Sequence, residues 1–262
     1  MVFDSHAHIF PEQLVDRAME VLSERYGAEP VARATPAGLL RHMDECGVDR
    51  AMVVGVATKP TQVESINAFL TDLHEPRLVP CGSLHPHSED IDGDVERLID
   101  AGVRGVKLQP HFQGYGLDDP GLDRILHCVG ERLPVLIHGG DEIIALPEVE
   151  PTPSRLAELH RRHPRVRLIL AHLGGYQRWD EVEKYLVGQD VFLDASYVFD
   201  ICSDEQIRRI IATHGIERVV WGSDFPWQTQ ARGLEGIRRL GFSEQEVAML
   251  LGGNLARLLG NP

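Results

Sequence analysis

The stretch Phe3-Asp4-Ser5-His6-Ala7-His8 gives the clearest indication of the fold, because an apolar start runs directly into two histidines one residue apart. Side chains alternate along a strand, so the rings of His6 and His8 point to the same face. We expect that face to be the interior of a barrel, with both rings at the C-terminal end of the first strand.

Short apolar runs of β type recur along the whole chain, separated by amphipathic stretches. Runs this rich in Val, Ile and Leu are typical of parallel strands that are buried on both faces. The eight runs are Met1–Phe3, Ala51–Ala57, Leu78–Leu84, Val103–Leu108, Pro134–His138, Arg167–His172, Val191–Ala195 and Val219–Trp221. Predicted helices are Thr61–His74, Asp94–Ala101, Ser154–His163, Ser203–His214 and Ser243–Leu259, and the last three begin at a serine that can act as N-cap.

This alternation predicts an α/β protein with one (β/α)8 TIM barrel over residues 1–262, since such a barrel typically has about 250 residues. The segment Pro11–Pro36 is longer than a βα loop requires and predicts a short helical insertion after the first strand. A doubly wound open sheet is the alternative. It usually has a glycine-rich phosphate loop after its first strand, and this sequence has none there.

The composition of the chain limits the kinds of molecule that this protein can bind. The chain has 262 residues, 43% of them hydrophobic, and a net charge of −14, which argues against nucleic acid as the partner. The four cysteines show no CxxC spacing, and no apolar run reaches the roughly 18 residues of a membrane span. Structured sequence begins at once, without a signal peptide. We therefore expect a cytoplasmic protein with a small-molecule substrate and no membrane contact; a homo-oligomer stays open.

Polar residues gather at the ends of the apolar runs. His6 and His8 end the first, His138 the fifth and His172 the sixth, while Asp224 follows the eighth. The C-terminal ends of barrel strands converge on one mouth, so these five side chains should meet there. Imidazoles with a carboxylate suit zinc and similar divalent metals. The sequence thus predicts a metal site, whereas any one of these histidines alone would more often be structural.

At these motifs the chain resembles the amidohydrolase superfamily, in particular its amidohydrolase-2 branch of TIM-barrel metal-dependent hydrolases related to aminocarboxymuconate semialdehyde decarboxylase. The resemblance covers the full length and lies in Asp4-Ser5-His6-Ala7-His8, Gly105-Val106-Lys107-Leu108-Gln109-Pro110, Val135-Leu136-Ile137-His138-Gly139, Leu170-Ala171-His172-Leu173-Gly174-Gly175, Gly222-Ser223-Asp224-Phe225-Pro226 and Gly253-Asn254-Leu255-Ala256-Arg257-Leu258-Leu259.

The resemblance implies a ligand set and roles for its members. His6, His8, His138 and Asp224 would bind one divalent metal, zinc in the first place with manganese as the alternative. His172 would hydrogen-bond the metal-bound water, or join the ligands as in two-metal members. Those members also have a carboxylated lysine on the fourth strand, so Lys107 could bridge a second metal; the alternative is an ammonium that binds a substrate carboxylate or pairs with an inner acid.

Five further residues near the predicted strand ends are candidates for substrate binding, although packing at the rim is an equal alternative for the aromatic ones. They are Gln109, His111, Tyr197, Phe225 and Trp227. A second His-x-His, His85-Pro86-His87, follows the third run. Its proline and the polar residues after it predict a solvated loop rather than metal ligands.

The predicted function is that of a metal-dependent hydrolase that uses a metal-activated water on a small amide, lactone, ester or imine-type substrate. Asp224 would take up and pass on the proton, and His172 would orient the water. The compact chain and Lys107 favour hydrolysis. The alternative is a metal-dependent non-oxidative decarboxylase of a small aromatic or unsaturated carboxylic acid; a second alternative is a catalytically inactive metal-binding barrel.

Overall fold

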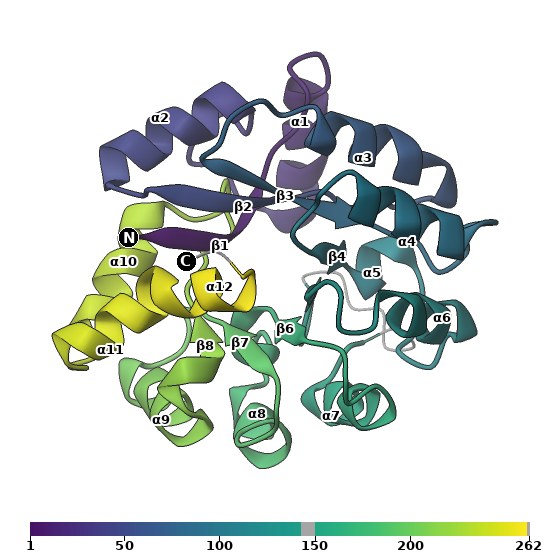
Figure 1. The fold of residues 1–262 in the computed structure, drawn as a ribbon. Coiled ribbons are helices and arrows are strands. Elements are labelled where there is room, and N and C mark those ends of the chain that lie inside the picture. The colour runs from purple at the N-terminus through teal and green to yellow at the C-terminus, as the bar shows by residue number, and fades with distance from the viewer. Residues whose placement is uncertain (143–149, 261–262) are drawn as a thin grey trace. The chain divides into compact units, whose positions relative to one another are not determined.

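The computed structural model describes residues 1–142 and 150–260, and within them the predicted alternation of strands and helices is present (Figure 1). The strands are β1 (Phe3–His8), β2 (Arg50–Val54), β3 (Leu78–Ser83), β4 (Val106–Leu108), β5 (Val135–Ile137), β6 (Leu168–Leu170), β7 (Phe192–Asp194) and β8 (Val219–Val220). They form one eight-stranded sheet in chain order from β1 to β8. Parallel strands in this order, with helices between them, confirm the (β/α)8 TIM-barrel class.

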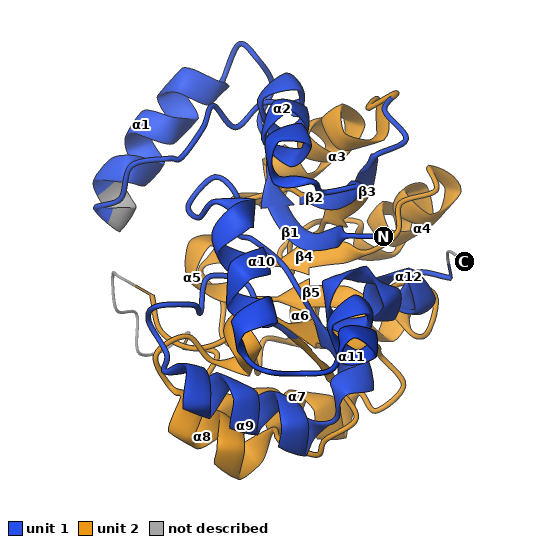
Figure 2. Cartoon of the chain, turned by 90° about the vertical axis from the view of Figure 1, so that its left-hand side faces the viewer, with its two compact units in different colours: residues 1–53, 75–79, 194–262 blue, residues 54–74, 80–193 orange. Residues whose placement is uncertain are grey.

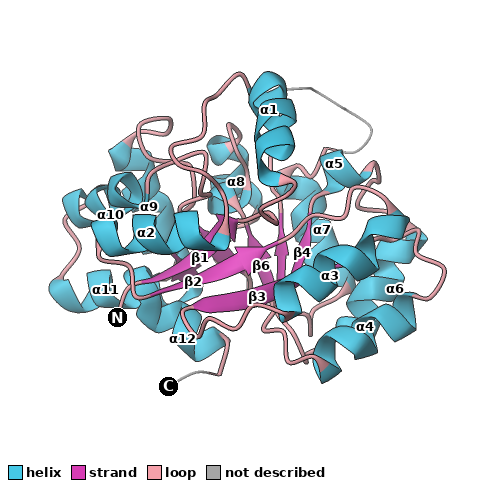
Figure 3. Ribbon diagram, turned by 90° about the horizontal axis from the view of Figure 1, so that it is seen from above, coloured by secondary structure: helices cyan, strands magenta, loops and turns pink. Residues whose placement is uncertain are grey.

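At least one helix follows each of these short strands (Figure 3). The helices are α1 (Val15–Tyr26), α2 (Pro36–Cys46), α3 (Val63–Thr71), α4 (Ile91–Asp100), α5 (Pro110–Gln113), α6 (Pro120–Val129), α7 (Pro153–Arg162), α8 (Trp179–Tyr185), α9 (Asp204–His214), α10 (Gln230–Arg239), α11 (Glu244–Ala248) and α12 (Asn254–Leu258). Single turns of 3-10 helix lie at Pro60–Gln62, His172–Gly174 and Ile216–Arg218, and a π-helical turn at Met249–Gly253. No helix in the described ranges has the length and apolarity needed to cross a membrane.

Helix α1 is the predicted insertion after the first strand, because α2 already supplies the helix between β1 and β2. Most boundaries differ from the predicted ones; the first apolar run, Met1–Phe3, overlaps β1 only at Phe3. Two of the differences have a local cause. Thr152, not Ser154, is the N-cap of α7, since its hydroxyl accepts a hydrogen bond from the backbone N–H of Arg155. The predicted helix Ser243–Leu259 is interrupted by the π turn, although the capping box of Ser243 and Glu246 is present.

The chain divides into two compact units (Figure 2). Unit 1 comprises residues 1–53, 75–79 and 194–262, and unit 2 comprises residues 54–74 and 80–193. The expectation that residues 1–262 form one domain stays a prediction.

In unit 1 the chain after β8 runs beside β1. The N–H of Asp224 donates to the carbonyl of His6 at 2.8 Å, and the N–H of His8 donates to the carbonyl of Phe225 at 2.7 Å. The N–H of Ser5 reaches the carbonyl of Trp221 at 3.0 Å. These backbone bonds fix the position of Asp224 relative to the two histidines of β1.

In unit 2 the central strands β4, β5 and β6 are buried at every position. Their registers pair Lys107 with Leu136, and Leu136 with Ile169. The aliphatic neighbours explain the apolar runs in the sequence, since parallel strands covered on both faces need apolar side chains. Lys107 is the exception on these strands, with only 2% of its surface exposed.

Candidate metal centre

Three of the predicted ligands lie together in unit 1. Asp224 Oδ1 is 3.4 Å from His6 Nε2 and 3.3 Å from His8 Nε2. The two rings lie with their centroids 5.1 Å apart, and one ligand atom from each residue falls within 4.8 Å of the others. His6 is buried, while the His8 and Asp224 side chains are 18% and 15% exposed. Two imidazoles and a carboxylate at this spacing fit a divalent metal that keeps positions open for a substrate.

A buried carboxylate lies behind His6. Asp194, at the end of β7, accepts a hydrogen bond from His6 Nδ1 at 2.9 Å and from the Ser196 hydroxyl at 2.8 Å. Its other oxygen accepts from the Ser5 hydroxyl at 2.9 Å. Because a carboxylate only accepts, Nδ1 of His6 carries the proton, and in the neutral ring the lone pair of Nε2 is available to a metal. A carboxylate in this position orients a metal-binding histidine and increases its basicity.

Asp4 holds the first strand and the segment after the eighth strand together. Its carboxylate accepts from the backbone N–H of His6 at 3.0 Å, from the N–H and hydroxyl of Ser223 at 2.9 and 2.5 Å, and from Gln230 Nε2 at 2.8 Å. Complete burial raises the pKa of Asp4 to about 6, and these hydrogen bonds oppose the rise. The network ties the backbone that carries His6 to the backbone that leads to Asp224.

Two predicted catalytic residues have left-handed backbone conformations. Asp224 has φ of 59° and His172 has φ of 57°. Such angles are uncommon outside glycine, and strained backbone clusters at functional sites. The sharp turns that these angles produce carry the chain directly from the strand ends into the segments that follow.

A second group of polar side chains lies in unit 2, after β4 and β5. His138 Nε2 is 3.2 Å from the Asp141 carbonyl and 3.5 Å from Glu142 Oε1. The His111 and His172 ring centroids lie 5.7 and 4.9 Å from the His138 centroid. One ligand atom each of His111, His138 and Glu142 falls within 4.8 Å of the others. The structure therefore brings His138 and His172 together, as predicted, and adds His111 and Glu142.

Burial lowers the pKa of His138 well below the usual value, and its neighbours His172, Lys107 and His111 lower it further. His138 is consequently neutral at pH 7, which is the form that can bind a metal. Burial raises the pKa of the Cys81 thiol to about 12, and the positive charge of Lys107 partly opposes this rise. Carboxylation of Lys107 stays a prediction.

Gln109 links the end of β4 to this group. Its Nε2 donates to Glu142 Oε1 at 2.8 Å, and its backbone N–H is held by Gln113 Oε1, also at 2.8 Å. Gln109 is 5% exposed, and its Oε1 accepts no hydrogen bond from any residue in the described ranges. The amide thus places one acceptor beside the histidine and carboxylate groups.

The other predicted substrate-binding residues differ in exposure. Phe225 is fully buried, with its ring centroid 5.4 Å from that of His42. Tyr197 and Trp227 are half-buried, and Tyr197 has φ of 52°. A role in substrate binding stays a prediction for all three.

Sequence reasoning missed Asp194, Ser196 and Glu142. The first two were signalled by Phe192-Leu193-Asp194-Ala195-Ser196, in which polar residues end the seventh apolar run as histidines end others. Glu142 has no comparable signal, because it lies beyond a strand end in a glycine-containing segment.

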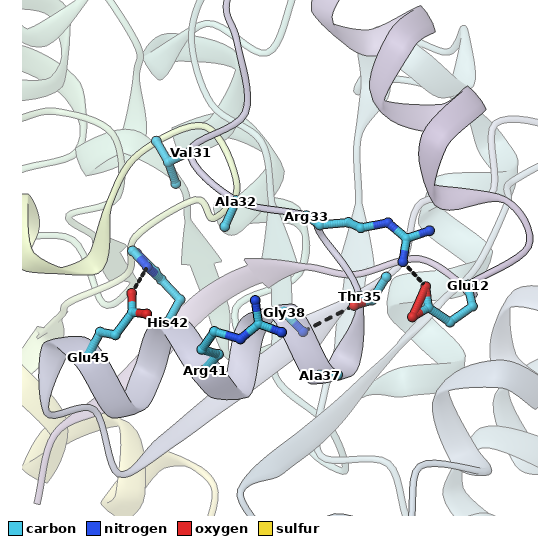
Figure 4. A pocket seen from close by; sticks show the side chains of 10 residues that line it. All are labelled: Glu12, Val31, Ala32, Arg33, Thr35, Ala37, Gly38, Arg41, His42 and Glu45. Atoms are coloured by element: carbon cyan, nitrogen blue, oxygen red, sulfur yellow. Dashed lines mark hydrogen bonds and ion pairs between the residues drawn. The ribbon is translucent and has the colours of Figure 1, made fainter.

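A pocket of about 230 Å³ in unit 1 lies against α2 and the preceding segment (Figure 4). None of the predicted ligands lines it. Two pairs of its lining side chains interact: Arg33 with Glu12, and His42 with Glu45 at 3.8 Å. The mixture of both charges gives this pocket no evident ligand preference.

Solved structures with this fold include several enzymes. A 5-carboxyvanillate decarboxylase from Sphingomonas paucimobilis is 18% identical over 100% of this chain and 99% of its own, with a TM-score of 0.75. A dihydroxybenzoic acid decarboxylase from a Polaromonas species was solved with bound manganese and the inhibitor 2-nitroresorcinol. It is 16% identical over 99% of this chain and 96% of its own, with a TM-score of 0.72. A probable 2-pyrone-4,6-dicarboxylic acid hydrolase from Acinetobacter baumannii is 18% identical over 99% of both chains, with a TM-score of 0.68.

At these identities the structures show a common fold. No curated protein sequence matches the chain. The amidohydrolase family model, Amidohydro_2, matches residues 3–260, and the chain therefore belongs to the amidohydrolase-2 family.

Proposed function

We propose that this enzyme is a metal-dependent non-oxidative decarboxylase of a small aromatic carboxylic acid, one that carries a ring hydroxyl. The observation that carries the proposal is the cluster of His6, His8 and Asp224, with Asp194 behind His6. The proteins of similar fold support decarboxylation over the hydrolysis favoured by the sequence, since those named above include two decarboxylases of aromatic acids.

The proposed cofactor is one divalent metal held by His6, His8 and Asp224. Zinc suits these ligands, but the Polaromonas enzyme binds manganese, so both metals belong in the test. The expectation that His138 supplies a further ligand rests on the sequence motif. A bound divalent metal would offset the negative charge of the substrate's carboxylate and hydroxyl oxygens.

The reaction needs one proton and breaks one carbon–carbon bond. The ring carbon that bears the carboxylate takes up a proton, and the bond to the carboxylate then breaks. Its electron pair returns to the ring and carbon dioxide leaves. We assign delivery of the proton to a carboxyl oxygen of Asp224, because this residue is partly exposed beside His6 and His8. Asp194 keeps the His6 ring in one tautomer and orientation during this step.

Hydrolysis is the second candidate. One protein of similar fold is a probable hydrolase of a cyclic ester, and Lys107 occupies the strand that carries a metal-bridging lysine in two-metal members. In this reaction Asp224 would take a proton from the attacking water and pass it to the leaving oxygen. Both reactions would use the same residues, so only the reaction products can distinguish hydrolysis from decarboxylation.

The deciding experiment supplies a panel of hydroxybenzoates and of lactones to protein loaded with manganese or zinc, in D₂O and in ¹⁸O-labelled water. Decarboxylation predicts carbon dioxide release and one deuteron on the ring carbon, without ¹⁸O in the aromatic product. Ring opening of a lactone with ¹⁸O in the new carboxylate would overturn the decarboxylase proposal in favour of hydrolysis. Absence of turnover across the panel would favour the inactive barrel.

A further inference from the structure

We propose that His42 and Gln230 are positioning residues of the proposed metal centre in unit 1. They would hold the turn at Asp224 in the shape that presents its carboxylate to the two histidines of β1. The inference rests on the metal site of the proposed function and is independent of the reaction that takes place there. Both residues are buried, and hydrogen bonds within unit 1 connect them to the segments that carry the ligands.

The first connection lies at the start of α10. Gln230 is the first residue of this helix, so its backbone N–H has no acceptor within the helix. His42, on α2, supplies an acceptor, because its Nε2 lies 3.2 Å from the Gln230 nitrogen. The neutral ring therefore carries its proton on Nδ1, which faces Glu45 Oε2 at 3.8 Å (Figure 4). Burial lowers the pKa of His42, which favours this neutral form.

The second connection is the side-chain amide of Gln230, which is completely buried. Its Nε2 donates to Asp4 Oδ2 at 2.8 Å, and the same oxygen accepts from the Ser223 hydroxyl at 2.5 Å. Asp4 Oδ1 accepts from the backbone N–H groups of His6 and Ser223. The Gln230 amide thus ties this carboxylate, and the two segments that it joins, to a helix.

The third connection reaches the turn itself. The Ser223 hydroxyl accepts from the N–H of Phe225 at 3.0 Å and so closes the backbone around Asp224. Asp224 has φ of 59°, a conformation that costs free energy outside glycine and persists only when its surroundings support it. The Phe225 ring is completely buried, and its centroid lies 5.4 Å from that of His42. His42 therefore supports the turn by packing, and Gln230 supports it by hydrogen bonds.

The metal centre requires this turn to be placed accurately. Asp224 Oδ1 lies 3.4 Å from His6 Nε2 and 3.3 Å from His8 Nε2. A metal held by these three atoms depends on that spacing, and so does a proton delivered by Asp224. A displacement of about 1 Å can lower a rate by about 10²-fold. A variant in which the turn relaxes should therefore bind metal more weakly and in a changed geometry.

The test measures metal binding by the full chain. We would determine the Kd for Mn²⁺ by calorimetry, and record the visible absorption of the Co²⁺-loaded protein, which reports the geometry of the ligands. Gln230→Met keeps the length of the side chain without the donor, and His42→Phe keeps a ring without the acceptor. Each should raise the Kd for Mn²⁺ by about 10-fold, the lower end of the effect of losing an orienting partner, and alter the Co²⁺ spectrum. His42→Gln should restore both, because its amide oxygen can replace Nε2 as the acceptor.

The matched control is Asn254→Leu. Asn254 is also a completely buried amide of unit 1, but its Nδ2 donates to the carbonyls of Ile216 and Val219, at the start of β8 rather than after its end. This variant should lower the melting temperature as Gln230→Met does, yet leave the Kd for Mn²⁺ and the Co²⁺ spectrum unchanged. Thermal melts identify any variant that fails to fold, and His42→Phe with its rescue by His42→Gln decides the question if Gln230→Met does.

The inference is overturned if folded Gln230→Met and His42→Phe keep the Kd and the Co²⁺ spectrum of the unaltered protein. It is also overturned if Asn254→Leu changes both as strongly, because the residues would then act through overall stability alone. Failure of the proposed function gives a different result. His8→Asn would then keep the stoichiometry and Kd of the unaltered protein, whereas loss of metal in His8→Asn with normal binding in the other two variants would overturn this inference alone.

Discussion

The two clusters use the same donor types but hold them differently. In unit 1, His6 and His8 share one strand, and backbone bonds from Asp224 and Phe225 fix the opposing segment. In unit 2, His111 lies on a short helix, His138 follows a strand, and Glu142 lies outside the helices and strands. Ligands on one strand keep their spacing when metal is absent, so the cluster of unit 1 should bind more tightly.

The groups around each cluster reinforce this difference. His6 donates to the carboxylate of Asp194, which favours a strongly basic Nε2. His138 is surrounded by His172, Lys107 and His111, and burial together with these groups lowers its pKa well below the usual value. We therefore expect the tighter metal binding at the cluster with a carboxylate behind it.

The largest effect should come from changing His6 and His8 to Ala together. The double variant loses two of three clustered ligands, so we expect it to lose one equivalent of metal and at least about 10³-fold of its activity, since metal-ion catalysis supplies several kcal/mol. Metal analysis and circular dichroism would measure content and fold. Full metal content in a folded double variant would contradict the ligand assignment.

A smaller effect is expected from Asp224→Asn. Asparagine keeps the shape and tolerates the left-handed backbone, but it cannot deliver a proton. We expect kcat to fall by about 10²–10⁴-fold at saturating metal, the usual contribution of a general acid or base. Asp200→Asn is the matched control, because Asp200 also has positive φ, at 68°, but pairs with Arg232 and Arg239 instead. Equal kcat losses in both variants would argue against proton transfer by Asp224.

Much of this comparison could be predicted from the sequence. Alternating apolar runs gave all eight strands, because strands buried on both faces leave a continuous apolar signature. The spacing of His6 and His8 predicted that the two rings lie on one face, as they do. Asp224 could be placed beside them because the fold sends the chain after the last strand back to the first.

The remaining features depend on tertiary contacts that no local pattern records. Asp194 and His6 are far apart in sequence and meet only because β7 ends beside Ser5 and His6 in the fold. Glu142 reaches His138 because Gly140 pairs with Tyr176, a contact between distant segments. The turn at Met249–Gly253 contains Gly252, where an added Cβ would lie 2.7 Å from the Met1 carbonyl oxygen. Periodicity alone could not reveal such an approach.

Asp194→Asn tests whether the carboxylate behind His6 accounts for the tighter metal binding that we expect at the cluster of unit 1. An asparagine oxygen can still accept from Nδ1, so the ring keeps its orientation while the negative charge is lost. We expect the Kd of the metal at His6, His8 and Asp224 to rise by about 10- to 100-fold. Ser196→Ala, which removes one donor to Asp194, should have a smaller effect. An unchanged Kd in a folded Asp194→Asn variant would contradict this role of the carboxylate.

The smallest effect is expected at the other His-x-His, His85-Pro86-His87. Here the structure differs in part from the predicted solvated loop: His85 is buried, whereas the His87 side chain is 54% exposed. His87 Nε2 lies 2.8 Å from Asp119 Oδ2, and the His87 N–H donates to His85 Nδ1. Asp119 thus pairs with the His87 ring and His85 Nδ1 accepts from a backbone N–H, whereas the Nε2 atoms of His6 and His8 both lie beside Asp224 Oδ1.

His87→Ala should therefore leave the metal content and the metal Kd unchanged. Its free energy of unfolding should fall by less than about 1 kcal/mol, because an exposed ion pair contributes little. Asp119→Ala should cost more, about 1 kcal/mol or above, since Asp119 Oδ1 also caps α6 by accepting from the Gly121 N–H at 2.7 Å. Urea unfolding of both variants, with metal analysis, makes the comparison. Loss of a metal equivalent in His87→Ala would mean that spacing alone, without a facing carboxylate like Asp224, is enough to bind metal in this fold.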